Sequence, residues 1–160
     1  MIRGINSSVF LSLLFPVLLL SGCGKNVIYT DSMTFPSEIW KLDKIAEFSP
    51  VISDTSASQN IYFTIRTGSS YPFRNIWLFV NTVSPSGKSI TDTLQYMLAD
   101  EKGKWFGKGF GDVRELNLPF RASVFFPEKG IYKFSIRHGM RIEDLKGVYD
   151  LGLRIERVKK

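Results

Sequence analysis

The chain of 160 residues contains a single cysteine and a single histidine. One cysteine leaves no partner for a disulfide within the chain, and a zinc site of the Cys/His kind needs several such ligands. The acidic residues also lack the D-x-[DN]-x-[DN]-G spacing of a calcium-binding loop. We therefore expect neither a bound metal nor a cofactor.

Catalytic motifs are equally scarce. A Ser-His-Asp triad would have to use His138, which we expect to be a surface or turn residue, and the G-x-S-x-G elbow is absent. The sequence also lacks the G-K-[ST] of a P-loop and the G-x-G-x-x-G fingerprint. Four acids close in sequence leave a glycosidase carboxylate pair open as an alternative: Asp100, Glu101, Asp112 and Glu115. We predict a protein that is not an enzyme.

A hydrophobic run long enough to span a bilayer is missing as well. The longest apolar run, residues 9–20, would cover roughly 18 Å as a helix, against about 30 Å of hydrocarbon. Arg3 precedes this run and small residues follow it, which is the layout of a secretory signal. We predict that residues 1–22 are an export signal and that cleavage falls between Gly22 and Cys23.

The cysteine stands at the end of Leu20-Ser21-Gly22-Cys23, which is similar to the lipobox of bacterial lipoproteins. The thiol would be the nucleophile that receives a diacylglyceryl group, and the small residues would let the peptide fit the signal peptidase. Two or more acyl chains anchor a protein stably. We predict that Cys23 is lipidated, and a free thiol after an ordinary signal is the alternative. Gly24, rather than an aspartate, favours the outer membrane.

The chain is basic, with a formal net charge of +6, and it stays basic after loss of Arg3. Anionic lipid headgroups, acidic glycans and acidic protein partners all suit such a surface. The basic residues are scattered except in residues 154–160, so a solvated basic tail is the simplest interpretation. Nucleic acid is not an expected partner of an exported, anchored protein.

The mature chain is typical of an all-β protein. Residues 23–58 are expected to form a lipidated N-terminus and an extended arm, and residues 59–160 an antiparallel β-sandwich, with a jelly roll as one possible arrangement. Alternation between turn-rich segments predicts strands at 61–66, 89–97, 131–137 and 149–158, and short apolar runs between turns predict strands at 76–83 and 122–126. Residues 76–83 are expected to be buried on both faces, and residues 140–147 could form a helical turn.

The most unusual stretch of this domain lies at residues 105–112. Its aromatic and glycine residues form a candidate partner or ligand loop: Trp105, Phe106, Gly107, Gly109 and Phe110. Glycines let the backbone bend and approach another surface, and the aromatic rings could stack on a sugar or grip a partner. A bulged arch whose aromatic rings cap the core is the alternative that we favour.

Several short motifs, in order along nearly the whole chain, resemble the GldH gliding-motility lipoproteins. They are the lipobox at Cys23, SYPFRN at 70–75, LAD at 98–100 with GKWFGKG at 103–109, FP at 126–127 with GIY at 130–132, MR at 140–141 and DLGL at 150–153. His138 departs from the polar amide that is common in that family.

The resemblance implies an envelope lipoprotein that is not an enzyme and is required for gliding over surfaces. It also implies work beside other gliding lipoproteins and the associated secretion machinery, with Cys23 as the one site residue. A lipid-anchored carbohydrate-binding module is the alternative function, with a glycan as its ligand.

Overall fold

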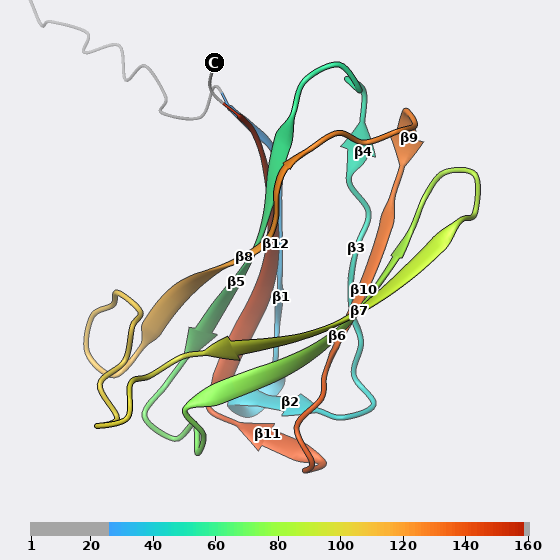
Figure 1. Ribbon diagram of the computed structural model, residues 1–160. Helices are drawn as coiled ribbons and strands as arrows, with labels where there is room; N and C mark the ends of the chain where they lie inside the picture. The colour runs from blue at the N-terminus through green and yellow to red at the C-terminus, as the bar shows by residue number, and fades with distance from the viewer. Residues whose placement is uncertain (1–25, 159–160) are drawn as a thin grey trace, which may run out of the picture.

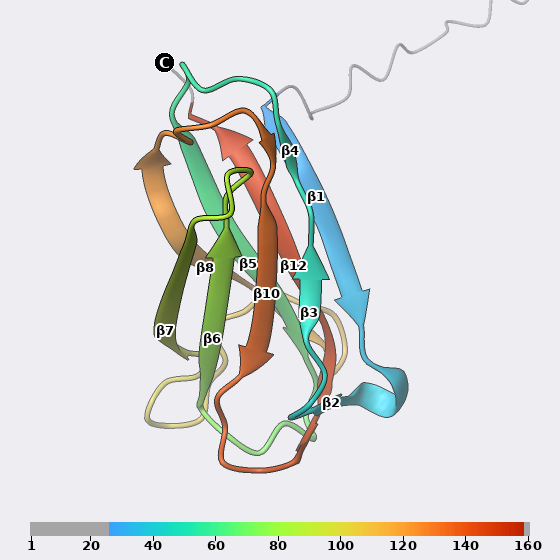
Figure 2. The same ribbon diagram turned by 90° about the vertical axis from the view of Figure 1, so that its right-hand side faces the viewer.

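The structure is a computed structural model that describes residues 26–158, so the predicted signal peptide and Cys23 lie outside the described residues. Two four-stranded sheets face each other as layers of a sandwich (Figures 1 and 2). The elements are β1 (Val27–Thr34), η1 (Pro36–Glu38, a 3-10 helix), β2 (Ile39–Lys41), β3 (Ala46–Phe48), β4 (Val51–Ile52), β5 (Gln59–Thr67), β6 (Asn75–Val83), β7 (Ser89–Met97), β8 (Arg114–Val124), β9 (Gly130–Ile131), β10 (Lys133–His138), β11 (Asp144–Lys146) and β12 (Val148–Arg157). No helix within residues 26–158 has the length and apolar character that a membrane crossing requires.

The strand order is that of a jelly roll. One sheet has the order β1-β12-β5-β8 and the other β3-β10-β6-β7, while β2–β11 and β4–β9 form short separate ladders. β1 pairs with β12, β3 with β10, β5 with β8, and β6 with β7. Among the eight strands of the two sheets, the first thus pairs with the last, the second with the seventh, and so on inward. All of these pairs are antiparallel. The prediction of an antiparallel all-β sandwich is confirmed.

The core lies between the inner faces of the two sheets, as period-two alternation requires. On β12, Leu151, Leu153 and Ile155 are fully buried, and Leu153 lies opposite Phe63 of β5. Burial of each such side chain stabilises the fold by about 1.5–3 kcal/mol. The alternation predicted for residues 149–158 is therefore confirmed.

Strand β6 is buried on one face only, and the prediction of burial on both faces is wrong. Ile76, Leu78 and Val80 are fully buried, whereas Trp77 is 37% exposed and Phe79 is half-buried. These two aromatic residues lie on the outer face of their sheet, which no further layer covers within residues 26–158. The guanidinium of Arg137 on the neighbouring strand lies 5.2 Å from the centre of the Phe79 ring.

The stretch expected to be an extended N-terminal arm contributes strands to both sheets. β1 pairs with β12 over its length, and β3 pairs with β10. Phe35, directly after β1, and Trp40 on β2 are both buried, and their rings stack with centroids 4.7 Å apart. β3 has only three residues, which is too short for alternation to identify, so its partner strand decides its conformation.

Three local predictions are wrong. Residues 140–147 hold the strand β11 at 144–146, paired with β2, instead of a helical turn, because Leu145 is buried opposite Trp40. The strand expected at 122–126 runs from 114 to 124, because its edge position tolerates Pro119. His138 is fully buried, since it shares the inward parity of Ile136 on β10.

Candidate functional site

The segment between β7 and β8 carries the chain from one sheet to the other by two tight reversals. In the first, the N–H of Phe106 donates to the carbonyl oxygen of Leu98 at 2.9 Å. The Asp100 carboxylate accepts hydrogen bonds from the backbone N–H groups of Lys102 and Lys104 at 2.9 and 2.8 Å. Asp100 therefore holds its own turn, as aspartates in turns commonly do.

The second reversal places residues 107–109 against the start of β8. Lys108 and Glu115 exchange two backbone hydrogen bonds, of 3.0 and 2.7 Å. A Cβ atom at Gly109 would lie 1.8 Å from the carbonyl oxygen of Val113, and one at Gly107 would lie 2.7 Å from that of Glu115. Both neighbours are backbone atoms, so this close approach requires glycine at these two positions.

The aromatic residues of the candidate loop have different environments. Trp105 is half-buried and packs edge-on against the buried ring of Tyr71, with centroids 6.0 Å apart. Phe106 is 60% exposed and Phe110 is 96% exposed. Burial raises the pKa of the Tyr71 hydroxyl, which fits its place in the core. Trp105 thus packs against the core, as in the arch that the sequence favoured. The rings of Phe106 and Phe110 are instead exposed at the surface.

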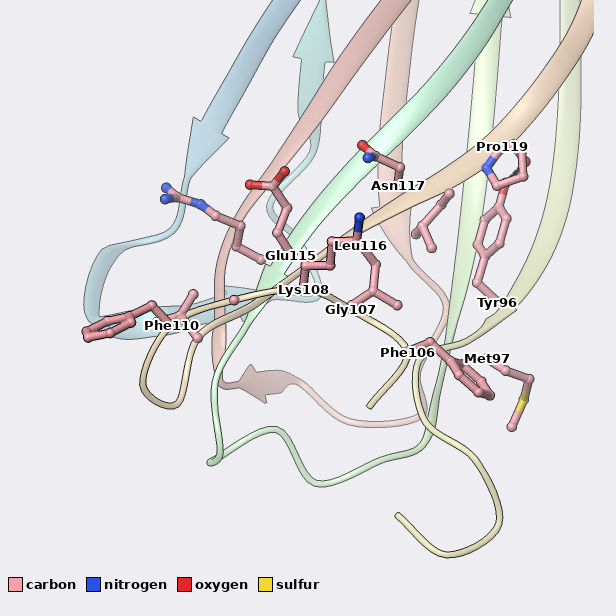
Figure 3. A pocket seen from close by; sticks show the side chains of 14 residues that line it. Tyr96, Met97, Phe106, Gly107, Lys108, Phe110, Glu115, Leu116, Asn117 and Pro119 are labelled. Atoms are coloured by element: carbon pink, nitrogen blue, oxygen red, sulfur yellow. Dashed lines mark hydrogen bonds between the residues drawn. The ribbon is translucent and has the colours of Figure 1, made fainter. Parts of the chain in front are cut away.

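A hollow of about 800 Å³ lies beside this loop, where the edge strands of the two sheets meet (Figure 3). Its lining comes from the end of β7, the loop and the first half of β8. Phe106 and Met97 lie together at one end, and Phe110 lies at the other end with Lys108 and Glu115 between them. The Tyr96 hydroxyl donates to the carbonyl oxygen of Pro119 at 2.9 Å, and this links the two edges of the hollow.

The polar groups of the hollow are suited to binding. Glu115 is the one carboxylate that lines it among residues 26–158, and Asn117 adds an exposed amide. Burial raises the pKa of Tyr96 to about 12, so its hydroxyl stays protonated and keeps its hydrogen bond to Pro119. No group of three or more His, Cys, Asp or Glu side chains that could hold a metal occurs in the described chain. A hollow lined by exposed rings, an amide, a lysine and a carboxylate could hold a peptide segment or a sugar.

Of the predicted carboxylate candidates, Glu115 alone lines the hollow. Asp100 is engaged in its turn, Asp112 lies near the Ser69 hydroxyl at 3.4 Å, and Glu115 faces the hollow. His138 lies elsewhere, in the core, where its ring meets Trp40 edge-on at 5.4 Å. Burial lowers the pKa of His138, and the backbone groups of Trp40 and Met140 beside the ring offset only part of this effect.

Sequence reasoning missed a polar cluster on the outer face of the sheet that holds β12. The Arg66 guanidinium pairs with the Asp150 carboxylate directly across β5 and β12, with Nε 2.6 Å from the oxygen. Arg154 and Thr64 line the same hollow of about 480 Å³. The sequence signal for this cluster is the set of polar residues at the outward positions of the alternating strands, such as Arg66 on β5 and Asp150 on β12.

Comparison with known proteins identifies the family. A sequence model of the GldH lipoprotein family matches residues 27–155. The chain is 34% identical over 157 residues to a gliding motility lipoprotein GldH homolog of Christiangramia forsetii, with 94% of this chain and 95% of the relative covered. It is 33% identical over 151 residues to the gliding motility lipoprotein GldH of Flavobacterium johnsoniae, with 90% and 93% covered.

Among solved structures, the enzymatically active domain of bacteriophage CBA120 tailspike protein 4 shows a weak likeness. It has a TM-score of 0.31 and 8% identity, and the alignment covers 82% of this chain and 18% of the other. A likeness of this size carries no argument about fold or activity. The sequence comparisons, by contrast, cover nearly the whole chain, and the chain belongs to the GldH lipoprotein family.

Proposed function

We propose that this protein is a lipid-anchored component of the cell envelope that takes part in gliding motility by binding other proteins, without catalysis. The observation that carries the proposal is the similarity to the Flavobacterium johnsoniae protein named gliding motility lipoprotein GldH, over 90% of this chain. The lipobox at Cys23 supports a lipid anchor, and Gly24 favours the outer membrane. Partners would be other gliding lipoproteins and components of the associated secretion machinery.

The loop at 105–110 is the proposed contact site for such a partner. Phe106 and Phe110 are more than half exposed, although burial of an aromatic ring is strongly favourable. Exposed aromatic residues in the middle of a polar rim are typical of protein-binding surfaces. Gly107 and Gly109 allow the loop to approach β8 closely, and the backbone hydrogen bonds between Lys108 and Glu115 hold it there. The shape of the loop is therefore defined before a partner binds.

Deletion of the gene, followed by complementation, tests this role. We expect the deletion to abolish colony spreading and the native gene to restore it. Complementation with Phe106→Ser and Phe110→Ser together should fail, because both exposed rings are lost. Leu42→Ser with Ile45→Ser is the matched control, since these side chains are also exposed, at 43% and 45%, but lie between β2 and β3. Normal spreading of the deletion strain, with normal adhesin export, would refute the role.

Glycan binding is the second candidate function, and the composition of the same hollow favours it. The exposed ring of Phe106 lines the same hollow as the Asn117 amide and the Glu115 carboxylate, so the hollow offers a stacking surface and hydrogen-bonding groups. Retention of the protein by immobilised surface polysaccharide measures this binding directly. We expect Phe106→Ala to abolish any such retention, and equal retention of this variant and the native protein would exclude the hollow as a sugar site.

A further inference from the structure

The described chain begins at one end of the sandwich, where several distant segments meet. The N–H of Arg157 donates to the carbonyl oxygen of Asn26 at 2.8 Å, and the N–H of Val158 donates to that of Ser58 at 2.9 Å. Figure 1 shows β4, β9 and the β6–β7 hairpin at this same end. We call it the anchor-side end and define it as residues 26, 51–58, 84–90, 125–131 and 157–158.

Chain length ties this end to any lipid on Cys23. Cys23 stands three positions before Asn26, and three residues reach about 10 Å when fully extended. β12, whose ten residues run the length of the sandwich, spans about 30 Å. A lipidated Cys23 therefore holds the anchor-side end near the bilayer, and a molecule standing on this end keeps Phe106 and Phe110 distant from it.

Exposed apolar side chains gather on the anchor-side end. Val51 on β4 is 62% exposed and lies directly opposite Ile131 on β9, which is 53% exposed. Phe125 is 61% exposed and borders a hollow that also involves Asn26. Ile90, beside the β6–β7 hairpin, is 63% exposed. Transfer of such side chains from water into the interfacial region of a bilayer is favourable.

The charges at this end suit an anionic surface. Lys88, Lys129 and Arg157 are exposed. Two carboxylates lie at the same end: Asp54 pairs with Arg157 at 3.0 Å, and Glu128 keeps its charge while it accepts hydrogen bonds from Ser86 at 3.0 and 2.8 Å. Lys88 and Lys129 therefore outweigh Glu128, the one of these two carboxylates that has no basic partner within the described residues. In the sequence, a lysine precedes Asn26 and two lysines follow Val158. Basic residues next to a lipid anchor add attraction to anionic headgroups.

We infer that the anchor-side end itself docks on the surface of an anionic bilayer, with Val51, Phe125 and Ile131 among the headgroups, so that the sandwich stands on its end. The opposite end, which carries the loop at 105–110, then faces away from that bilayer. This inference rests on the proposed lipidation of Cys23. It adds a second contact beside the lipid and an orientation for the proposed partner site.

Depth-dependent fluorescence quenching in vesicles tests the orientation. Cys23 is the only cysteine and is occupied by lipid in the full lipidated chain, so one introduced cysteine gives a single thiol for an environment-sensitive dye. We would label Val51→Cys and Ile131→Cys at the anchor-side end, and Phe106→Cys and Phe110→Cys as matched exposed positions at the other end. The vesicles contain phosphatidylethanolamine and phosphatidylglycerol, with a nitroxide-labelled lipid as quencher.

We expect the dyes at Val51 and Ile131 to be quenched at least about twofold more than those at Phe106 and Phe110, because the two ends are about 30 Å apart. Equal quenching at both ends would indicate a molecule lying on its side and would overturn the inference, as would absent quenching at Val51 and Ile131. Replacement of phosphatidylglycerol by phosphatidylcholine should weaken quenching at these two positions. Quenching in vesicles does not depend on gliding. A failure of the proposed role in motility is therefore distinguishable from a failure of this orientation.

Discussion

The hydroxyl of Tyr96 on β7 donates a hydrogen bond of 2.9 Å to the carbonyl oxygen of Pro119 on β8, and this bond joins the edge strands of the two sheets. Backbone groups of Glu115 point away from β5 toward Lys108, so by alternation those of Pro119 also point outward. Proline has no N–H, and the Pro119 carbonyl is already engaged by Tyr96. This part of the β8 edge is therefore protected from pairing with an additional strand.

Tyr96→Phe should lower the free energy of unfolding by about 1 kcal/mol, because the Pro119 carbonyl loses its donor while the ring still packs. Urea denaturation of the native protein and the variant measures the difference. Tyr62→Phe, on the outer face of β5, is the control for loss of a phenolic hydroxyl. Equal stability of the Tyr96→Phe variant and the native protein would contradict the structural importance of this bond.

Stability should decrease as the pH falls below the ordinary pKa of histidine, because burial lowers the pKa of His138 from its usual value of 6.5. Between the ordinary pKa and the lowered one, the histidine is protonated in the unfolded chain but neutral in the folded protein. The free energy of unfolding therefore falls as the pH decreases through this range. Urea midpoints from about pH 7 to about pH 5 measure this slope, since most carboxylates titrate lower. His138→Leu should flatten it, and parallel curves for the two proteins would rule the histidine out as its source.

Arg66→Ala should destabilise the protein by about 2 kcal/mol, because it leaves the Asp150 carboxylate without its charged partner. The Asp150 side chain is only 5% exposed, whereas Arg66 is 48% exposed and solvent screens part of the pair. Thermal or urea unfolding gives the difference. Lys133→Ala, an exposed basic residue of β10, is the matched control, and an Arg66 variant no less stable than this control would show that the pair adds nothing.

Gly109→Ala should change the loop at 105–110 while leaving the sandwich folded. Its Cβ would collide with the backbone oxygen of Val113, so the hydrogen bonds between Lys108 and Glu115 must break or shift. We expect this variant to fail in restoring colony spreading, with an unfolding temperature within a few degrees of the native value. Gly103→Ala meets open space and costs only about 1 kcal/mol of backbone strain, so it should restore spreading.

Cys23→Ala should release the protein from the membrane fraction without unfolding it, because one residue carries the lipid and the described fold begins after it. Cell fractionation with immunoblotting measures the location, and circular dichroism of the released protein measures the fold. Firm retention of this variant in the membrane fraction would contradict the predicted lipid anchor.

The sequence alone was sufficient for the strands that have a long and regular alternation. Residues 61–66 and 89–97 fall within observed strands, as do residues 149–157 of the segment predicted at 149–158, because alternating apolar residues record burial on one side of a sheet. The class of fold follows from several such strands between turn-rich segments. The family follows from ordered motifs along the chain, and both predictions are confirmed.

Only the tertiary structure decided which short segments became strands and which side chains stayed exposed. β1 depends on β12, which is distant in sequence, and β3 is too short to show a pattern of its own. His138 was placed by the inward parity of β10. Trp105 is covered because Tyr71 lies beside it, whereas Phe106, the next residue, has no such cover and is exposed. Local alternation specifies that a residue faces one side of a strand, but long-range pairing specifies what, if anything, lies on that side.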